Sequence, residues 1–311
     1  MKSKRNKTID LPLAEGADYL ARCVTVTRPA ALDEVLDRTI LGDSFEVLPL
    51  LPAQCADLLI ADPPYNLSKD FHGNAFARMS DADYAAYTER WITAVKPLLK
   101  PNASLYVCCD WQTSPIVGMA LSRHFYVRNR ITWQREKGRG AKNNWKNAME
   151  DIWFATCARD YSFYIENVMQ RRRVIAPYRA DGAPRDWEET ASGAFRNTCP
   201  SNFWDDISVP YWSMAENTAH PTQKPEKLLA KLILASSAPG GVVLDPFAGS
   251  GSTAVTAKKL GRRFLSVEQN PQYCVWAELR LERAETDRTI QGYTDGVFWE
   301  RNTTAQQKKH T

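Results

Sequence analysis

The chain contains 311 residues, of which 44% are hydrophobic and 24% charged, as in an ordinary globular protein with a sizeable core. A formal net charge of +4 excludes a strong overall field for nucleic acid, so any such affinity requires a local basic patch. The seven cysteines are scattered without a CxxC pair, and no apolar run approaches the ~18 residues of a membrane span. We therefore predict a cytoplasmic protein with reduced thiols, no bound metal and no membrane contact.

Short apolar runs bounded by turn residues predict the strands of a largely buried sheet. These runs are residues 40–41, 56–61, 104–110, 126–136, 150–157, 241–247 and 262–269. The runs at 126–136 and 150–157 are expected to form an antiparallel pair at an edge of the sheet.

Amphipathic segments with apolar residues at helical spacing lie between these strands. They are residues 80–101, 114–124, 222–241, 251–261 and 273–285. In the first, Ser80 is expected to cap the helix, with Asp83 completing a capping box, and Thr222 is a candidate cap for the third. The inner face of the first helix is predicted to carry Tyr84, Tyr87, Trp91, Val95 and Leu98.

Strands alternating with helices predict a doubly wound α/β fold with a mostly parallel sheet and an antiparallel edge strand. Residues 161–219 interrupt the alternation with a long irregular insert rich in Pro, Arg, Asn, Trp and Ser. The predicted division is an N-terminal extension (1–39), two halves of one domain (40–160 and 220–290) around the insert, and a C-terminal tail (291–311).

The stretch VVLDPFAGSGSTA, residues 242–254, joins a strand to a helix through a glycine-rich turn. Gly249 and Gly251 would let backbone N–H groups approach a ligand that a Cβ atom would obstruct, although a plain tight turn is the competing interpretation. Glu268 ends the next strand about 20 residues later, where an acid in such folds accepts hydrogen bonds from ribose hydroxyls. These features predict a nucleoside-containing cofactor and leave NAD and S-adenosylmethionine both open.

The stretch ADPPY, residues 61–65, ends another buried strand with a rigid turn. The amino nitrogen of adenine is a poor nucleophile because its lone pair is delocalised into the ring. The Asp62 carboxylate and the Pro63 carbonyl could accept its two hydrogens and free that lone pair, while the Tyr65 ring stacks on the base. The prolines would hold these groups in place, and this chemistry favours S-adenosylmethionine over NAD.

Three motifs of the chain resemble those of the amino-group DNA methyltransferases of bacteria and phages. They are ADPPYN, HPTQKPEKLL and LDPFAGSGST, and Gly42-Asp43 lies upstream of them. The catalytic motif precedes the cofactor motif with the insert between them, which is similar to the β group of N6-adenine methyltransferases. The resemblance covers residues 40–283 apart from the insert. It implies a Rossmann-like S-adenosylmethionine-dependent methyltransferase fold with circularly permuted motif order. It also implies double-stranded DNA as substrate, with the adenine flipped out of the helix.

The resemblance further implies a role for each matching residue. Asp62, Pro63, Pro64 and Tyr65 would form the catalytic turn. Glu268 would bind the ribose, and Asp43 would lie near the adenine of the cofactor. The other cofactor-binding residues would surround its methionine part: His220, Thr222, Gln223, Lys224, Asp245, Phe247, Ala248, Gly249, Ser250 and Gly251. The insert would recognise the target sequence, and a homodimer and a cognate restriction endonuclease are the implied protein partners.

Basic residues near the catalytic turn and in the insert are the predicted DNA contacts. They are Lys69, Arg135, Lys137, Arg139, Lys142, Lys146, Arg171, Arg172 and Arg173. The polar loop after Tyr65 is expected to close over the flipped base. For that loop and for the triple arginine, the competing interpretation is a solvated surface. Three tryptophans are expected to pack in the interior: Trp133, Trp153 and Trp204.

Three other functions remain open on the sequence. A cytosine-N4 methyltransferase of the same family more often has Ser-Pro-Pro-Tyr, so Asp62 favours adenine. The G-x-G-x-x-A loop also fits an NAD-dependent oxidoreductase, which would leave ADPPY unexplained. A silent DNA-binding module with the same fold would have lost Asp62, Tyr65 or the glycines, and all of them are present.

Overall fold

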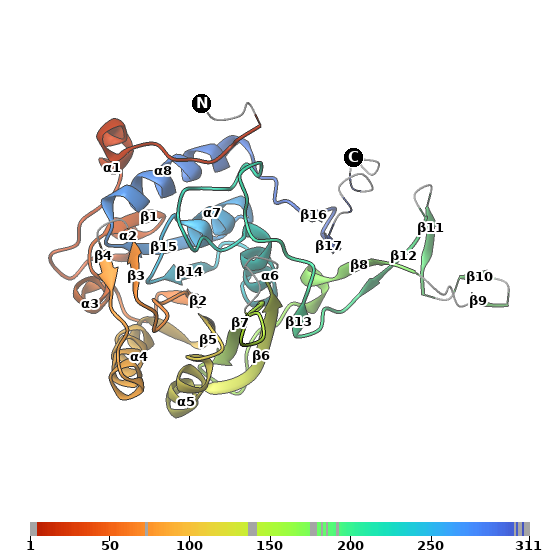
Figure 1. The fold of residues 1–311 in the computed structure, drawn as a ribbon, viewed down its shortest axis with the longest axis horizontal. Coiled ribbons are helices and arrows are strands. Elements are labelled where there is room, and N and C mark those ends of the chain that lie inside the picture. Colours follow the sequence, from red (N-terminus) through yellow and green to blue (C-terminus); the bar gives the residue numbers. More distant parts are fainter. Residues whose placement is uncertain are drawn as a thin grey trace.

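The computed structural model describes residues 5–71, 74–135, 142–174, 179–181, 183–184, 186–190, 193–301, 303 and 307. An eight-stranded sheet forms the centre of the molecule, with helices on both faces (Figure 1). In spatial order its strands are β1 (Arg38–Leu41), β15 (Arg263–Glu268), β14 (Val242–Asp245), β2 (Ala56–Ala61), β5 (Leu99–Cys109), β7 (Met149–Thr156), β6 (Tyr126–Gln134) and β13 (Phe203–Trp204).

Neighbouring strands of this sheet run parallel except at β7, which is antiparallel to both β5 and β6. The predicted α/β fold with a mostly parallel sheet is confirmed. The predicted antiparallel pairing of the runs at 126–136 and 150–157 is confirmed by β6 and β7. Only their position at the very edge of the sheet is wrong, because β13 from the insert pairs in parallel with β6, Trp204 lying opposite Trp133. The insert therefore extends the sheet beyond the antiparallel strand.

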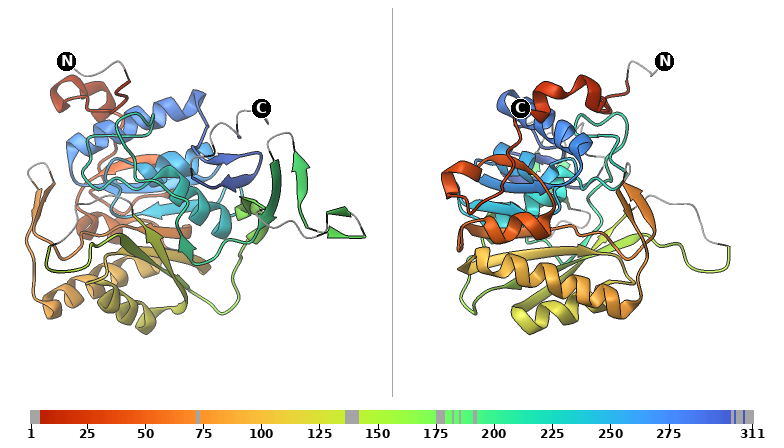
Figure 2. Two further views of the ribbon diagram at one scale, coloured as in Figure 1. Left: turned by 45° about the vertical axis from the view of Figure 1, so that its right-hand side comes forward. Right: turned by 90° about the vertical axis from the view of Figure 1, so that its left-hand side faces the viewer.

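Two hydrophobic clusters fill the space between the sheet and its helices, one on each face. The first lies under α2 (Leu32–Val35), α3 (Ser44–Val47), α4 (Asp81–Val95) and α5 (Ser114–His124). The second lies under α6 (Glu226–Ser236), α7 (Ser252–Lys259) and α8 (Pro271–Thr286). Two further views show the three layers (Figure 2). Side chains of β2 alternate between the clusters, Leu58 packing in the second and Leu59 in the first, as expected of a strand buried on both faces.

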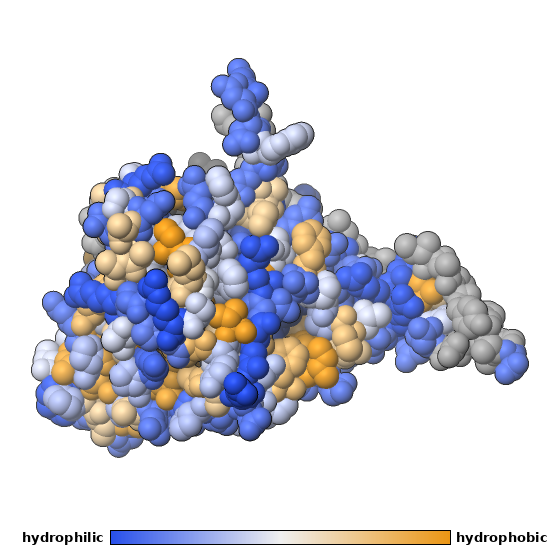
Figure 3. Space-filling view, turned by 90° about the horizontal axis from the view of Figure 1, so that it is seen from below, coloured by the Kyte–Doolittle hydropathy of each residue, from blue (hydrophilic) through white to orange (hydrophobic). Residues whose placement is uncertain are grey.

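The remaining elements are short. They are η1 (Leu13–Glu15), α1 (Ala17–Leu20), η2 (Leu48–Leu50), β3 (Lys69–Phe71), β4 (Asn74–Phe76), η3 (Lys96–Leu98), η4 (Ile165–Val168), β9 (Arg179–Ala180) and β10 (Ala183–Pro184). In the part of the chain that the structure describes, no helix combines the length and apolarity needed to cross a membrane. Figure 3 looks onto the face covered by α4 and α5, where hydrophobic residues form separate spots among hydrophilic ones.

Helix α4 begins as its sequence predicts. The Ser80 hydroxyl accepts the Asp83 N–H at 3.1 Å and so caps the helix. Tyr84, Trp91 and Val95 are fully buried on its inner face, as expected. The helix ends earlier than predicted, at Val95 rather than near residue 101. Pro97 lies in the 3-10 turn that follows, and β5 starts at Leu99 rather than at residue 104.

Three strands of the insert form a second sheet with residues from the end of the chain. Its strand order is β11 (Glu188–Thr190), β12 (Gly193–Thr198), β8 (Gln170–Arg173), β17 (Val297–Trp299) and β16 (Tyr293–Thr294). Strands β8, β11 and β12 extend away from the body on the right of Figure 1. Residues that the sequence placed in a C-terminal tail thus pair with the insert, Phe298 lying opposite Gln170.

A buried ion cluster fastens the insert to the body at its C-terminal end. Lys231 of α6 donates to both carboxylate oxygens of Asp206, at 2.7 and 2.8 Å. Lys227 forms a second ion pair with Asp206 at 2.7 Å and also donates to the Trp299 carbonyl of β17. All three charged side chains are almost completely buried. One carboxylate therefore compensates two buried ammonium groups at the junction of α6, β13 and β17.

Replacing Asp206 should destabilise the protein strongly, because it leaves two buried lysines without their carboxylate. We expect Asp206→Ala to lower the free energy of unfolding by about 3–5 kcal/mol in urea titrations. The neighbouring Asp205 is exposed, so Asp205→Ala is the matched control and should change it by less than about 0.5 kcal/mol. Equal effects of the two substitutions would contradict the assigned role of the cluster.

Candidate active site

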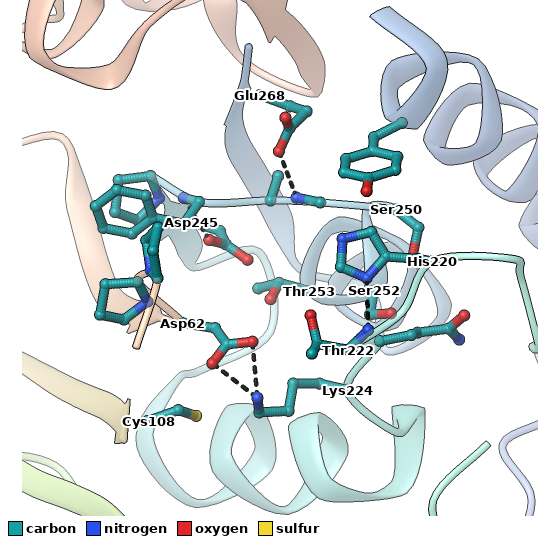
Figure 4. Close-up of a pocket in the computed structure, with 18 of the residues that line it drawn as sticks. Asp62, Cys108, His220, Thr222, Lys224, Asp245, Ser250, Ser252, Thr253 and Glu268 are labelled. Atoms are coloured by element: carbon teal, nitrogen blue, oxygen red, sulfur yellow. Dashed lines mark hydrogen bonds and ion pairs between the residues drawn. The ribbon is translucent and has the colours of Figure 1, made fainter. Parts of the chain in front are cut away.

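A cavity of about 440 Å³ opens at the carboxyl ends of β2 and β14, which pair in parallel near the centre of the sheet. Its wall includes residues 62–65 after β2, residues 220–224 before α6 and residues 245–250 after β14. Figure 4 shows their side chains converging across the cavity, with Glu268 of β15 at one end. The three sequence motifs thus meet at the crevice where open α/β sheets bind ligands.

The turn after β14 needs glycines for two different reasons. Gly249 and Gly251 have φ angles of +53° and +74°, a backbone conformation that side chains disfavour. A Cβ atom on Gly251 would lie 2.6 Å from the Cβ of Ala277, so this glycine allows α7 to pack on α8. A Cβ atom on Gly249 would lie 3.0 Å from Nε2 of His220, in the wall of the cavity. Gly249 therefore keeps the cavity open.

Two carboxylates face the cavity, the buried Asp245 and the half-buried Glu268. Glu268 accepts the backbone N–H groups of Gly249 at 2.7 Å and Asn270 at 2.8 Å, and burial raises its pKa. Asp245 accepts the N–H of Phe247 at 2.9 Å, and burial raises its pKa to about 7. Acceptors in these two positions suit the ribose hydroxyls and the amino group of a nucleoside cofactor, and the space left by Gly249 suits its chain.

Contacts from α4 and from the following loop fix the Asp62–Tyr65 turn. The Tyr84 hydroxyl donates to the Pro64 carbonyl at 3.0 Å. The Asn66 side chain donates to the Met79 carbonyl at 2.9 Å and accepts the Met79 N–H at 2.7 Å. This pair of hydrogen bonds closes the base of the loop that carries β3 and β4, and the turn is anchored on both sides.

Lys224 occupies an unexpected place in the cavity. Its ammonium group donates to both Asp62 oxygens at 2.7 Å and to the Tyr65 hydroxyl at 3.0 Å, as Figure 4 shows for Asp62. It also lies 3.3 Å from Oε2 of Glu150. Burial by itself would lower the pKa of Lys224, but the carboxylates of Asp62 and Glu150 outweigh it and raise that pKa above its usual value. The ammonium therefore points at the Asp62–Tyr65 turn.

The other residues of the HPTQK segment shape the loop as well as the cavity. The Gln223 amide accepts the Thr218 N–H at 2.8 Å and donates to the Glu216 carbonyl at 2.7 Å, so it holds the loop closed. Nδ1 of His220 accepts the Thr222 N–H at 3.3 Å, and its ring packs edge-on against Tyr273. Thr222 is not the helix cap, because α6 begins four residues later, at Glu226.

Helix α6 starts after Pro225, which provides no side-chain cap. The Glu226 N–H is instead satisfied by the Glu216 carboxylate, at 2.7 Å. Burial, followed by the charge of Glu226, raises the pKa of Glu216 to about 7. An acid from the preceding loop thus replaces the cap that the sequence suggested, and it ties that loop to the helix.

Four more predicted cofactor residues line the cavity: Asp43, Phe247, Ala248 and Ser250. Asp43 also caps α3 by accepting the Phe45 N–H at 2.7 Å. The Ser250 carbonyl also accepts a hydrogen bond from Arg280. Gly251 is not among the residues that line the cavity in the described chain, which agrees with its role in packing α7 on α8.

The predicted DNA contacts outside the triple arginine fall into three groups. Lys142 and Lys146 are exposed on the segment before β7, beside Trp145, whose exposed fraction is 94%. Arg135 lies in the cavity wall and pairs with Glu150. Lys137, Arg139 and the side chain of Lys69 lie outside the described residues.

The triple arginine of β8 is largely engaged within its own sheet. Arg171 pairs with Glu188 at 3.0 Å and lies over the ring of Phe195. Arg172 donates to the Gln170 side chain, while Arg173 is exposed. Trp133 and Trp204 are buried and Trp153 is half-buried, in line with the expected packing roles.

Sequence reasoning missed Glu150, which lines the cavity beside Tyr65 and Lys224. The sequence did carry a signal, because Glu150 is the first residue of the predicted buried strand at 150–157. A buried acid needs a hydrogen-bond or charge partner. The sequence also named Tyr84 as a core residue only, without its hydrogen bond to the Pro64 carbonyl.

Fold and cavity together define an α/β enzyme with a nucleoside-type pocket beside an Asp-Pro-Pro-Tyr turn. The DNA methylase family of N6 and N4 enzymes matches residues 56–279, well over half of the chain. The chain belongs to this family. The predicted DNA methyltransferase activity, its S-adenosylmethionine cofactor and its Rossmann-like fold are thereby confirmed.

Curated relatives and solved structures show the same likeness. The chain is 34% identical over 255 residues to DNA adenine methyltransferase YhdJ of Escherichia coli, covering 79% of this chain and 83% of that protein. It is 29% identical over 248 residues to type II methyltransferase M.HpaI of Haemophilus parainfluenzae, covering 79% and 74%.

Two solved structures share the fold. The PvuII cytosine-N4-specific DNA methyltransferase has a TM-score of 0.58 at 18% identity, over 83% of this chain and 88% of that one. A putative DNA modification methylase from Thermus thermophilus, complexed with S-adenosyl-L-methionine, has a TM-score of 0.56 at 21% identity, over 86% and 99%.

Filling the space at Gly249 should block the cofactor pocket. We expect Gly249→Val to weaken S-adenosylmethionine binding at least 100-fold in isothermal titration calorimetry, because the added side chain meets His220. Gly240 has a similar φ of +75° with open space around it, so Gly240→Val imposes comparable backbone strain away from the cavity. That control should bind the cofactor like the native protein, and equal losses in both variants would refute the assignment.

Proposed function

We propose that this protein transfers a methyl group from S-adenosylmethionine to N6 of an adenine flipped out of double-stranded DNA. The observation that carries the proposal is the Asp62 carboxylate in the wall of the same cavity as Gly249 and Glu268. An amino-group acceptor and a nucleoside pocket are thus adjacent, which a methyl transfer to nitrogen requires.

The residues of the cavity divide between cofactor and target. S-adenosylmethionine supplies an electrophilic methyl group on a positively charged sulfur. Glu268 would hold its ribose hydroxyls and Asp245 its amino group, while His220 and Phe247 would enclose its methionine chain. Leu67 and Phe76, also in the cavity wall, would offer apolar contact to the flipped base.

At the target, the Asp62 carboxylate and the Pro63 carbonyl would each accept one N6 hydrogen and aim the nitrogen lone pair at the methyl group. The N–C bond would form as the C–S bond breaks, and one N6 proton would then pass to the Asp62 carboxylate, restoring a neutral amino group. Tyr65 supports Asp62 through a hydrogen bond of 2.9 Å. Burial holds the pKa of Tyr65 well above its usual value, so the phenol remains a neutral donor.

Adenine is favoured over cytosine by the acid in the turn and by the relatives. The 34% identical relative is named as an adenine methyltransferase. The N4-specific PvuII enzyme, at 18% identity, supports the fold without deciding the base. The cytosine-N4 reaction is therefore the second candidate, and the methylated product distinguishes the two.

Binding of duplex DNA would bring the predicted contacts together around the cavity mouth. Lys142, Trp145 and Lys146 are exposed shortly before Glu150, which lines the cavity. We assign target recognition to residues 161–219, catalysis to 40–160 and cofactor binding mainly to 220–290. A homodimer and a cognate endonuclease would fit a type II enzyme such as the relative M.HpaI, and the site of action would be the cytoplasm.

Removing the Asp62 carboxylate should abolish methyl transfer without preventing cofactor binding. We expect Asp62→Ala to lower the rate of tritium transfer to DNA at least 1000-fold, with S-adenosylmethionine affinity within about threefold of the native value. Nucleosides from DNA methylated by the native protein should contain N6-methyladenine. N4-methylcytosine as the sole product would overturn the adenine assignment, and undiminished turnover of the variant would overturn the mechanism.

Lysines before β7 should contribute to DNA affinity through phosphate contacts. We expect Lys142→Ala with Lys146→Ala to reduce the slope of log affinity against log salt by about 2, measured by fluorescence anisotropy. A control pair, Lys258→Ala with Arg283→Ala, lies toward the far ends of α7 and α8 and should leave the slope unchanged. An unchanged slope in the first variant would show that the lysines are ordinary solvated surface.

A further inference from the structure

The catalytic carboxylate is crowded with donors in the structure. Oδ1 of Asp62 receives the Lys224 ammonium at 2.7 Å and the Tyr65 hydroxyl at 2.9 Å, and Oδ2 receives the same ammonium at 2.7 Å. A carboxylate oxygen has about two acceptor sites. The three hydrogen bonds from these two groups therefore leave about one site for the amino group of the target base.

Glu150 offers those same donors a second carboxylate. Its Oε2 lies 3.3 Å from Nζ of Lys224 and 3.4 Å from the Tyr65 hydroxyl. The Glu150 side chain is only 5% exposed, so water cannot take its place as the acceptor for Lys224 and Tyr65. Arg135 pairs with its other oxygen and balances the charge. Two carboxylates and two cations thus form one compensated group around the catalytic turn.

The charge that develops during transfer makes this second carboxylate useful. The target nitrogen becomes positive as it takes the methyl group, and an ammonium held on Asp62 opposes that change. If Lys224 shifts toward Glu150, Asp62 gains a free acceptor site and its negative charge faces the reacting nitrogen. The buried ammonium keeps a carboxylate partner throughout, which avoids the cost of an unpaired buried charge.

We propose that Glu150 is a positioning residue for methyl transfer, which draws Lys224 and the Tyr65 hydroxyl toward itself and so leaves Asp62 available to the target amino group. The proposal rests on the methyl transfer at Asp62 described above. Glu150 itself touches neither the base nor the cofactor in this scheme, and its effect reaches them through Lys224 and Tyr65.

Substitution of Glu150 should affect turnover more than binding. We expect Glu150→Gln, which keeps the shape and removes the charge, to lower kcat at least 20-fold. The KM values for S-adenosylmethionine and DNA should stay within about threefold. Glu150→Asp keeps the negative charge. Its loss in log kcat should be at most two thirds of the loss caused by Glu150→Gln. Glu278→Gln neutralises a similarly buried acid of α8 outside the cavity and should leave kcat unchanged.

A double substitution separates positioning from mere stability. In the Glu150→Gln background Lys224 is held by Asp62 alone, so adding Lys224→Met should raise kcat at least threefold. A structural role predicts the opposite, a further loss together with a lower melting temperature by circular dichroism. A kcat for Glu150→Gln within twofold of native, or a double variant slower than the single one, would overturn the proposal.

Failure of this inference is distinguishable from failure of the proposed function. If the native protein methylates adenine while Glu150→Gln is unaffected, only the role of Glu150 is wrong. If the native protein yields no N6-methyladenine, the function itself is wrong.

Discussion

The parallel pairing of β2 with β14 is the constraint on which the site depends. Leu58 and Leu59 lie opposite Val243 and Leu244, so two segments nearly two hundred residues apart end at one edge of the sheet. Their last residues lead directly into the Asp-Pro-Pro-Tyr turn and the glycine turn. Since neighbouring parallel strands deliver their carboxyl ends together, this register places the Asp62 carboxylate and the glycine turn in the wall of one cavity.

Several buried charged side chains lie together in this site, and they form ion pairs with one another. Asp62 and Glu150 share Lys224, and Arg135 completes the group. Asp245 stands apart from these cations, which explains why burial raises its pKa to about 7. Buried charges are also shared beside α6, where Asp206 forms ion pairs with both Lys227 and Lys231. These ion pairs connect the insert and β17 to the body. In both places the sheet is joined to surrounding segments by charges that must stay paired.

Much of the fold was predictable because local patterns agree with it. Buried strands on both faces read as continuous apolar runs, and the cap at Ser80 set the start of α4 correctly. The end of α4 was less predictable, since the apolar residues around Pro97 suit either a helix or the strand that begins at Leu99. The outermost strand β13 escaped detection because it has two residues, too few for any periodicity. Pairing of β17 with β8 joins segments more than 120 residues apart, and no local signal encodes it.

The sequence by itself determined the chemistry: the two acid-ended strands, the rigid turn and the glycine turn are local features whose backbone demands are visible in the residues. Tertiary structure decided how those groups share charges. It placed Lys224 on Asp62, engaged Arg171 with Glu188 and brought Glu150 into the cavity wall. The physical reason is that a motif fixes where its own backbone goes, whereas the partner of a long charged side chain depends on which distant segments the sheet brings within a few ångströms.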